Sequence, residues 1–97
     1  MIGMQQFVSK TFKFHILGSS NEIKCRVKME VYCPEITKQS VDVLANELKK
    51  FMEEHQDARD LIHLSELVKV KLKNIIPINV IEVSLVETNG YGIEFVV

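Results

Sequence analysis

The chain has 97 residues, of which 46% are hydrophobic and 26% are charged, with only four glycines and two prolines. These proportions are typical of one ordinary globular domain, and they exclude collagen-like, disordered and disulfide-framework proteins. The 12 basic and 13 acidic residues give a net charge of -1, so we expect no nucleic-acid partner.

The apolar segments are too short to cross a membrane. The longest uninterrupted apolar runs have two or three residues, far below the roughly 20 that span a bilayer. Residues 1–13 also lack the basic and apolar regions of a secretory signal. A chain of this length buries little more than about 60% of its unfolded surface, so we expect it to associate into a homo-oligomer.

The two cysteines indicate a reducing compartment. Cys25 and Cys33 lie eight residues apart in one predicted strand, which is about 26 Å at the usual rise and too far for a disulfide bond. Two free thiols favour a cytoplasmic protein with no membrane partner.

Two alternating segments predict an N-terminal β-hairpin. Residues 8–16 alternate between apolar and polar side chains, with Lys10 as the one exception. Residues 23–33 alternate throughout, and the turn residues 18–21 separate the two segments. We therefore expect two antiparallel strands that share one apolar face.

The pairing of these strands can be predicted from the same pattern. Closing the hairpin with Leu17 opposite Glu22 places Phe14 opposite Cys25, so that apolar residues face apolar residues. The other face then carries a basic row, which consists of Lys13, Lys24, Arg26 and Lys28.

Two amphipathic helices are expected after this hairpin. Thr37 or Ser40 would cap the first helix, in which apolar residues recur every three or four positions over residues 41–52. A second apolar stripe runs through residues 61–75, and Pro77 ends it.

A second hairpin completes the chain. Residues 81–85 and 91–97 alternate, and between them Asn89-Gly90 is a strong signal for a two-residue turn. The order is strand, strand, helix, helix, strand, strand, with no internal linker. We therefore expect residues 1–97 to form a single α+β domain, ββααββ, with a four-stranded antiparallel sheet covered on one face by two helices.

Four short strings share a pattern with one enzyme family. They are residues 12–15 (Phe-Lys-Phe-His), 23–25 (Ile-Lys-Cys), 57–61 (Asp-Ala-Arg-Asp-Leu) and 87–88 (Glu-Thr). They resemble, in order, the Phe-x-x-x-His, His-Gly-His, Asp-His-x-x-Leu and Glu-Thr strings of the 6-pyruvoyl-tetrahydropterin synthase and 6-carboxy-tetrahydropterin synthase family. The resemblance implies the tunnelling fold, in which subunits join their sheets into a barrel around a central channel, with the helices outside.

The resemblance fails at the metal site. In the family three histidines hold a catalytic zinc ion, but only His15 matches, because Ile23 and Cys25 stand at the other two places. A catalytic zinc usually has three protein ligands, and an isoleucine cannot be one. The alternation also sends Cys25 to the apolar face and His15 to the polar face, so we expect no metal and no other cofactor.

The catalytic residues of the family are also missing. Ala58 stands where the family has the histidine that transfers a proton. His55 and His63 lie nearby in sequence and are either displaced replacements or ordinary surface histidines. No cysteine precedes Cys25, which we interpret as a small core residue and not as the family's nucleophile. We therefore expect no catalytic residue of the zinc-dependent lyase reaction.

One part of the ligand site is retained. The family's glutamate in the Glu-Thr string accepts hydrogen bonds from the ring N–H and amino groups of a pterin, and Glu87 matches it. Glu87 also continues the apolar row of residues 81–85, where an ionised group needs a partner or a place at the sheet end. We predict that Glu87, Thr88 and His15 bind a pterin or a purine; the alternative is a strand-end carboxylate in water.

The basic row has two interpretations. It is either a solvated sheet face or the lining of a channel of the kind that the resemblance implies. In a channel, Glu30, Glu82 and Glu94, which share this face, would offset the repulsion between subunits.

These observations leave three functions open. The chain is either a divergent 6-pyruvoyl-tetrahydropterin synthase-like protein with a degenerate active site, or a non-catalytic oligomeric structural or interaction module. A third reading, by resemblance to aldolases of the same fold, is a metal-free pterin enzyme.

Overall fold

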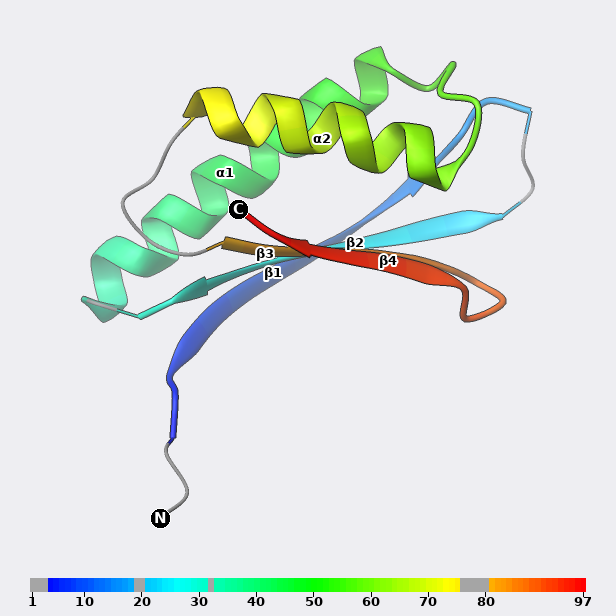
Figure 1. Cartoon of the computed structure of the whole chain (residues 1–97). Coiled ribbons are helices and arrows are strands. Elements are labelled where there is room, and N and C mark those ends of the chain that lie inside the picture. Colours follow the sequence, from blue (N-terminus) through cyan, green and yellow to red (C-terminus); the bar gives the residue numbers. More distant parts are fainter. Residues whose placement is uncertain (1–3, 19–20, 32, 76–80) are drawn as a thin grey trace.

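The computed structural model describes residues 4–18, 21–31, 33–75 and 81–97. The elements follow the predicted order: β1 (Phe7–His15), β2 (Glu22–Glu30), α1 (Pro34–Glu54), α2 (Leu61–Ile75), β3 (Ile81–Glu87) and β4 (Gly92–Val96) (Figure 1). The four strands form one antiparallel sheet in the order β1-β2-β3-β4. The predicted α+β architecture, ββααββ, is therefore confirmed.

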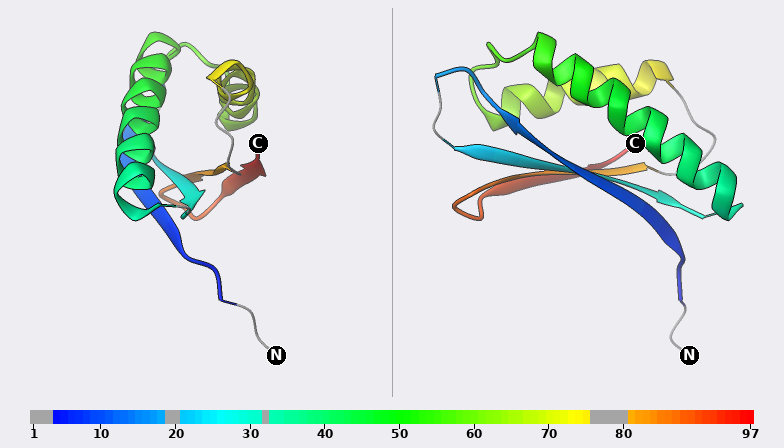
Figure 2. Two further views of the ribbon diagram at one scale, coloured as in Figure 1. Left: turned by 90° about the vertical axis from the view of Figure 1, so that its left-hand side faces the viewer. Right: turned by 180° about the vertical axis from the view of Figure 1, so that it is seen from behind.

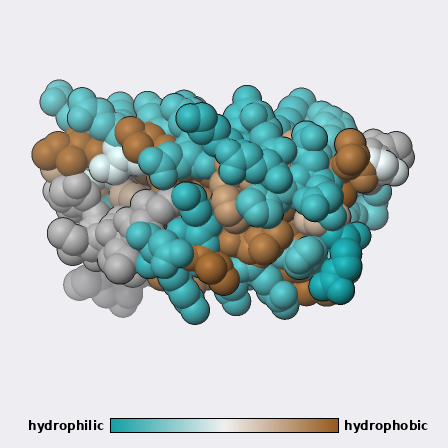
Figure 3. Space-filling view, turned by 90° about the horizontal axis from the view of Figure 1, so that it is seen from above, coloured by the Kyte–Doolittle hydropathy of each residue, from teal (hydrophilic) through white to brown (hydrophobic). Residues whose placement is uncertain are grey.

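The domain is a two-layer slab that measures 44 × 29 × 18 Å. Both helices lie on one side of the sheet, and the opposite side of the sheet is bare (Figure 2). Seen from the helix side, the surface is mainly hydrophilic, with separate apolar patches (Figure 3). No helix in the described part of the chain is both long and apolar enough to cross a bilayer.

The core lies between the sheet and the helices, because each strand turns alternate residues toward them. In β2 the side chains of Ile23, Cys25 and Val27 are at most 1% exposed. The helices contribute apolar residues from one stripe each, which are Val41, Leu44, Leu48, Met52, Leu61, Leu64, Val68 and Leu72. Burying one aliphatic side chain of this size stabilises a fold by about 1.5–3 kcal/mol.

The predicted register of the first hairpin is wrong by two residues. His15, and not Leu17, lies opposite Glu22, and Phe14 lies opposite Ile23. The Leu17 N–H donates a hydrogen bond (2.8 Å) to the carbonyl of Gln56 between the two helices, so this residue contacts the helix layer instead of extending the ladder. Because the shift is an even number of residues, the same rows still face the helices.

The second hairpin has a three-residue turn, not the predicted two-residue turn. The Glu87 N–H donates to the Tyr91 carbonyl (2.8 Å), and the Gly90 N–H donates to the Glu87 carbonyl (2.9 Å). Gly90 has a φ of +93°, as the last residue of such turns requires. A two-residue turn would shift the register by one and move Phe95 to the bare face. Packing of the apolar row therefore decides the turn length.

The first helix begins earlier than its predicted caps. Cys33 is the N-cap of α1 and Pro34 is its first residue, without a side-chain cap hydrogen bond. Proline supplies a helical φ and needs no partner for an N–H, so Thr37 and Ser40 lie inside the helix. The second helix spans the predicted residues 61–75, and its predicted end at Pro77 lies outside the described residues.

Lys10, the exception in the apolar row of β1, has a partner on α1. Its Nζ lies 2.9 Å from Oδ1 of Asp42, and both side chains are about half exposed, at 44% and 59%. The lysine therefore reaches the rim of the helix layer without entering the core. An exposed ion pair of this kind contributes less than about 1 kcal/mol.

We expect Gly90→Ala to lower the free energy of unfolding by about 1 kcal/mol or more, because a Cβ atom disfavours positive φ. Gly90→Asn should lose less, since asparagine tolerates this conformation. Urea denaturation of the three proteins measures the difference. Equal stability of the alanine variant and the wild type would show that the turn adopts another conformation.

Candidate functional site

The three predicted ligand residues lie at one end of the sheet, where both hairpin turns meet. His15 pairs with Glu22 at the start of β2, and Glu87 pairs with the next residue, Ile23. The Thr88 hydroxyl donates a hydrogen bond to the Glu22 carbonyl (3.2 Å). The first residues of β2 therefore connect all three positions.

Glu87 and His15 nevertheless belong to opposite faces of the sheet. Glu87 ends the helix-facing row of β3 and is partly exposed, whereas His15 is exposed on the bare face. Strand β2 separates them, which places their backbones about 10 Å apart at the usual strand spacing. A single chain therefore presents these two side chains to different surroundings.

The positions that would bind zinc by resemblance are used for packing. Ile23 is 1% exposed and Cys25 is 0% exposed, and both lie in the core, while His15 points to the other side. This confirms that Cys25 is a core residue. Among the described residues, no three His, Cys, Asp or Glu side chains lie close enough together to hold a metal ion. The residues present do not fit a three-histidine zinc site.

The thiol of Cys25 is not a nucleophile in the folded chain. Burial raises the pKa of Cys25 from an ordinary value of 9.0 to about 12, because desolvation disfavours the thiolate. The thiolate is the reactive form of cysteine, so Cys25 is unreactive at neutral pH. Cys33 is also a free thiol and is partly exposed.

His55 stabilises the end of α1. Its Nδ1 lies 2.8 Å from the carbonyl oxygen of Phe51, and since a carbonyl only accepts, Nδ1 carries the hydrogen. The imidazole also lies on the Phe51 ring, with 4.2 Å between the ring centroids. His55 therefore has a structural role at the helix C-terminus.

His63 stabilises the start of α2. Its backbone N–H donates to Oδ1 of Asp60 (2.8 Å), and its Nδ1 accepts a hydrogen bond from the Arg59 N–H (3.1 Å). This reciprocal pair resembles a capping box, with histidine in the place of glutamate. Asp60 before the apolar stripe was a readable cap signal that the sequence analysis missed.

The bare face of the sheet carries the predicted basic row. Lys13 lies 3.5 Å from Glu22, and Lys28 lies 3.1 Å from Glu82. Phe7 belongs to the same face, although the sequence analysis started the strand one residue later. The Arg26 guanidinium and the Lys28 ammonium lie 5.4 Å and 4.4 Å from the centre of its ring.

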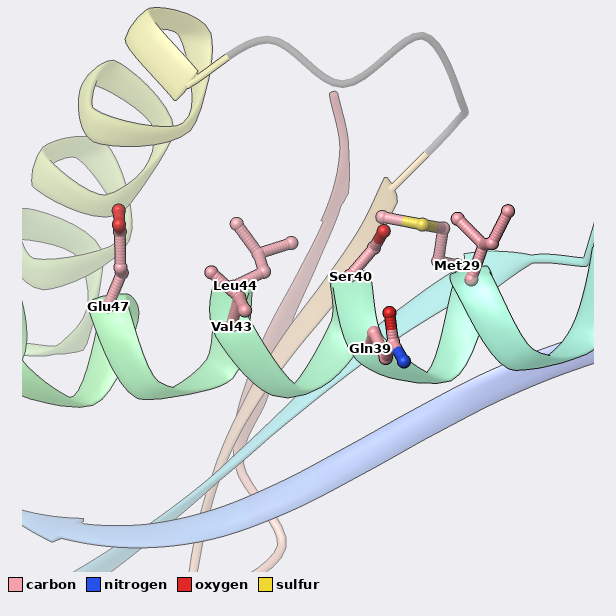
Figure 4. Close-up of a pocket in the computed structure, with 7 residues that line it drawn as sticks. Met29, Gln39, Ser40, Val43, Leu44 and Glu47 are labelled. Atoms are coloured by element: carbon pink, nitrogen blue, oxygen red, sulfur yellow. The ribbon is translucent and has the colours of Figure 1, made fainter.

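A separate, mainly apolar hollow of about 320 Å³ lies along α1 (Figure 4). It is lined by Met29, Ile36, Gln39, Ser40, Val43, Leu44 and Glu47. Met29 pairs with Ile81 at the far end of the sheet from Glu87. Its one titratable group is Glu47, so the hollow does not extend the predicted ligand site.

Comparison with protein-family models, with curated proteins and with solved structures found no match. The function is therefore argued from the residues and the geometry of this chain.

We expect alkylation of the native protein by iodoacetamide to modify Cys33 alone, and alkylation in urea to modify Cys25 as well, as measured by mass spectrometry. In a Cys33→Ser variant the native protein should resist labelling even at pH 9, since its remaining thiol stays protonated.

The same thiol makes stability fall at alkaline pH. The unfolded thiol ionises near its ordinary pKa of 9.0 and the folded one near 12, so this contribution is complete below pH 9 and is lost as the pH rises toward 12. A Cys25→Ala variant should lack this part of the pH dependence. Rapid labelling of native Cys33→Ser protein would contradict the buried position of Cys25.

Proposed function

We propose that this chain is a divergent member of the 6-pyruvoyl-tetrahydropterin synthase-like family that keeps the subunit and its ring assembly. It binds a pterin or a purine at Glu87 and does not carry out the zinc-dependent reaction. The ββααββ subunit with one bare sheet face supports the assembly. The packing of Ile23 and Cys25 in the core argues against the zinc chemistry.

The observation that carries this proposal is the opposite charge of the two free sheet edges. The full positive charges of β1 are Lys10 and Lys13, and it has no acidic residue, whereas the one charged residue of β4 is Glu94. Two β1 edges would bring lysines together, and two β4 edges would bring glutamates together. Pairing β4 of one copy with β1 of the next joins opposite charges and covers both edges.

The strand directions suit such a ring. Each strand is antiparallel to its neighbour, so β1 and β4 run in opposite directions within a subunit. Copies related by a rotation therefore continue an antiparallel sheet from one subunit to the next. Lys13 and Glu94 both lie on the bare face, which would line the centre of the ring.

Glu87 has the properties of a ligand acceptor. It is partly exposed at the end of β3, and its carboxylate has no hydrogen-bond or ion-pair partner among the described residues. A carboxylate accepts two hydrogen bonds from the adjacent N–H and amino groups of a pterin or guanine ring. In a ring, a neighbouring subunit would supply further groups around the ligand.

We expect a pterin to bind the purified protein, and Glu87→Gln to weaken that binding by about tenfold or more, because a charged acceptor is lost. Fluorescence titration measures the affinity, with Glu66→Gln on the exposed side of α2 as the control. A metal assay of the same preparation should find less than one zinc per chain. Stoichiometric zinc, or equal binding by both variants, would overturn the proposal.

We expect the charge reversals Lys13→Glu and Glu94→Lys each to reduce the assembled fraction, because like charges would then meet at the seam. The double variant K13E/E94K should regain assembly, whereas Lys49→Glu on α1 should have no effect. Light scattering coupled to gel filtration measures the mass. A monomeric wild type, or a double variant no better than the single ones, would show that these edges do not pair.

A second candidate function is a non-catalytic oligomeric module, which the opposite edge charges support equally. Assembly without pterin binding would favour it, whereas metal-independent turnover of a bound pterin would favour an enzyme. The two free cysteines are consistent with a place in the reducing cytoplasm for either function.

A further inference from the structure

The central strand β2 carries two cations with no carboxylate beside them. Lys24 and Arg26 are both exposed on the bare face. Neither lies within ion-pair distance of a carboxylate among the described residues, whereas Lys13 and Lys28 on the same face do. The basic row is therefore compensated at its ends and uncompensated in its middle.

The strand register places like charges directly opposite each other. Lys24 pairs with Lys13 on β1, and its other neighbour, Val86 on β3, is apolar. Side chains opposite each other on an antiparallel pair have Cβ atoms about 4.5–5.5 Å apart, and like charges there are destabilising. An anion bound between the two ammonium groups would remove this repulsion.

Hydroxyl groups flank the third cation. Arg26 lies opposite Thr11 on β1 and opposite Ser84 on β3, and both side chains are at least partly exposed. Arg26 and Lys24 are two residues apart on one face, which is about 7 Å along a strand. Three cations and two hydroxyls thus cover an area of the size of one or two phosphate groups, on strands that the sheet holds in place.

We propose that Lys13, Lys24 and Arg26 form a binding site for a small phosphate-bearing anion with two or more charges, such as a pyrophosphate group. A guanidinium binds such groups through paired hydrogen bonds, and the lysines add charge. The site lies within one chain, so it depends neither on the ring nor on Glu87.

The acidic residues around the cluster limit what can bind. Glu82 and Glu94 line a small hollow beside Arg26, and Glu22 lies next to Lys13. An extended polyanion such as RNA would meet these carboxylates, whereas one or two phosphate groups fit between them. The net charge of -1 also offers no field that would attract a nucleic acid.

The test is a titration of the full chain with tripolyphosphate, pyrophosphate and ADP at constant ionic strength, followed by calorimetry and by thermal unfolding. At about ten times the dissociation constant, the ligand should raise the melting temperature by roughly 5–10 °C. Lys24→Gln and Arg26→Gln should each weaken binding by about tenfold or more. Lys49→Gln on α1, which removes the same charge elsewhere, should bind like the wild type.

A second readout separates a binding role from a structural one. Without ligand, Lys24→Gln should melt higher than the wild type by about 1–5 °C, because the repulsion from Lys13 is gone. Tighter binding of ADP than of pyrophosphate would identify a nucleotide as the source of the phosphates, and equal binding would identify the phosphates alone. The proposal is overturned if sodium chloride alone reproduces the stabilisation, if Lys49→Gln weakens binding equally, or if an RNA oligonucleotide binds more tightly than tripolyphosphate.

Discussion

The burial of one sheet face under two helices is the constraint on which the rest of this structure depends. The helix-facing row of β2, with Ile23, Cys25 and Val27, is almost fully excluded from solvent. Positions in this row cannot serve a metal or a substrate without giving up the core. The places that would hold two zinc ligands by resemblance are therefore filled with side chains whose role is packing, and burial keeps the one thiol among them protonated.

The same constraint leaves the other sheet face and the two outer edges without partners in a single chain. A slab of two layers covers only half of its sheet, and an uncovered edge strand is a template for association. The charges are distributed accordingly, with lysines on β1, a glutamate on β4 and cations in the middle of β2. The ring proposal uses the edges and the anion site uses the middle of the face, so each can fail without the other.

The candidate site could be read from the sequence only in part. The alternation placed Cys25 in the core and Glu87 at the end of a helix-facing row, and both positions are as predicted. The roles of His55 and His63 could not be read in this way, because each depends on how a helix ends. Their hydrogen bonds to Phe51, Arg59 and Asp60 are local, but they form only once the helix boundary is set by packing on the sheet.

The sequence by itself determined the order of the elements, the two faces of each strand and the two helix stripes, because periods of 2 and 3.6 are intrinsic to strands and helices. Only the tertiary structure decided the registers and the turn lengths. The contact of Leu17 with Gln56 shifted the first hairpin by two residues, and the burial of Phe95 required three residues in the second turn. Those registers place Lys24 opposite Lys13, since cross-strand neighbours depend on contacts between residues far apart in the chain.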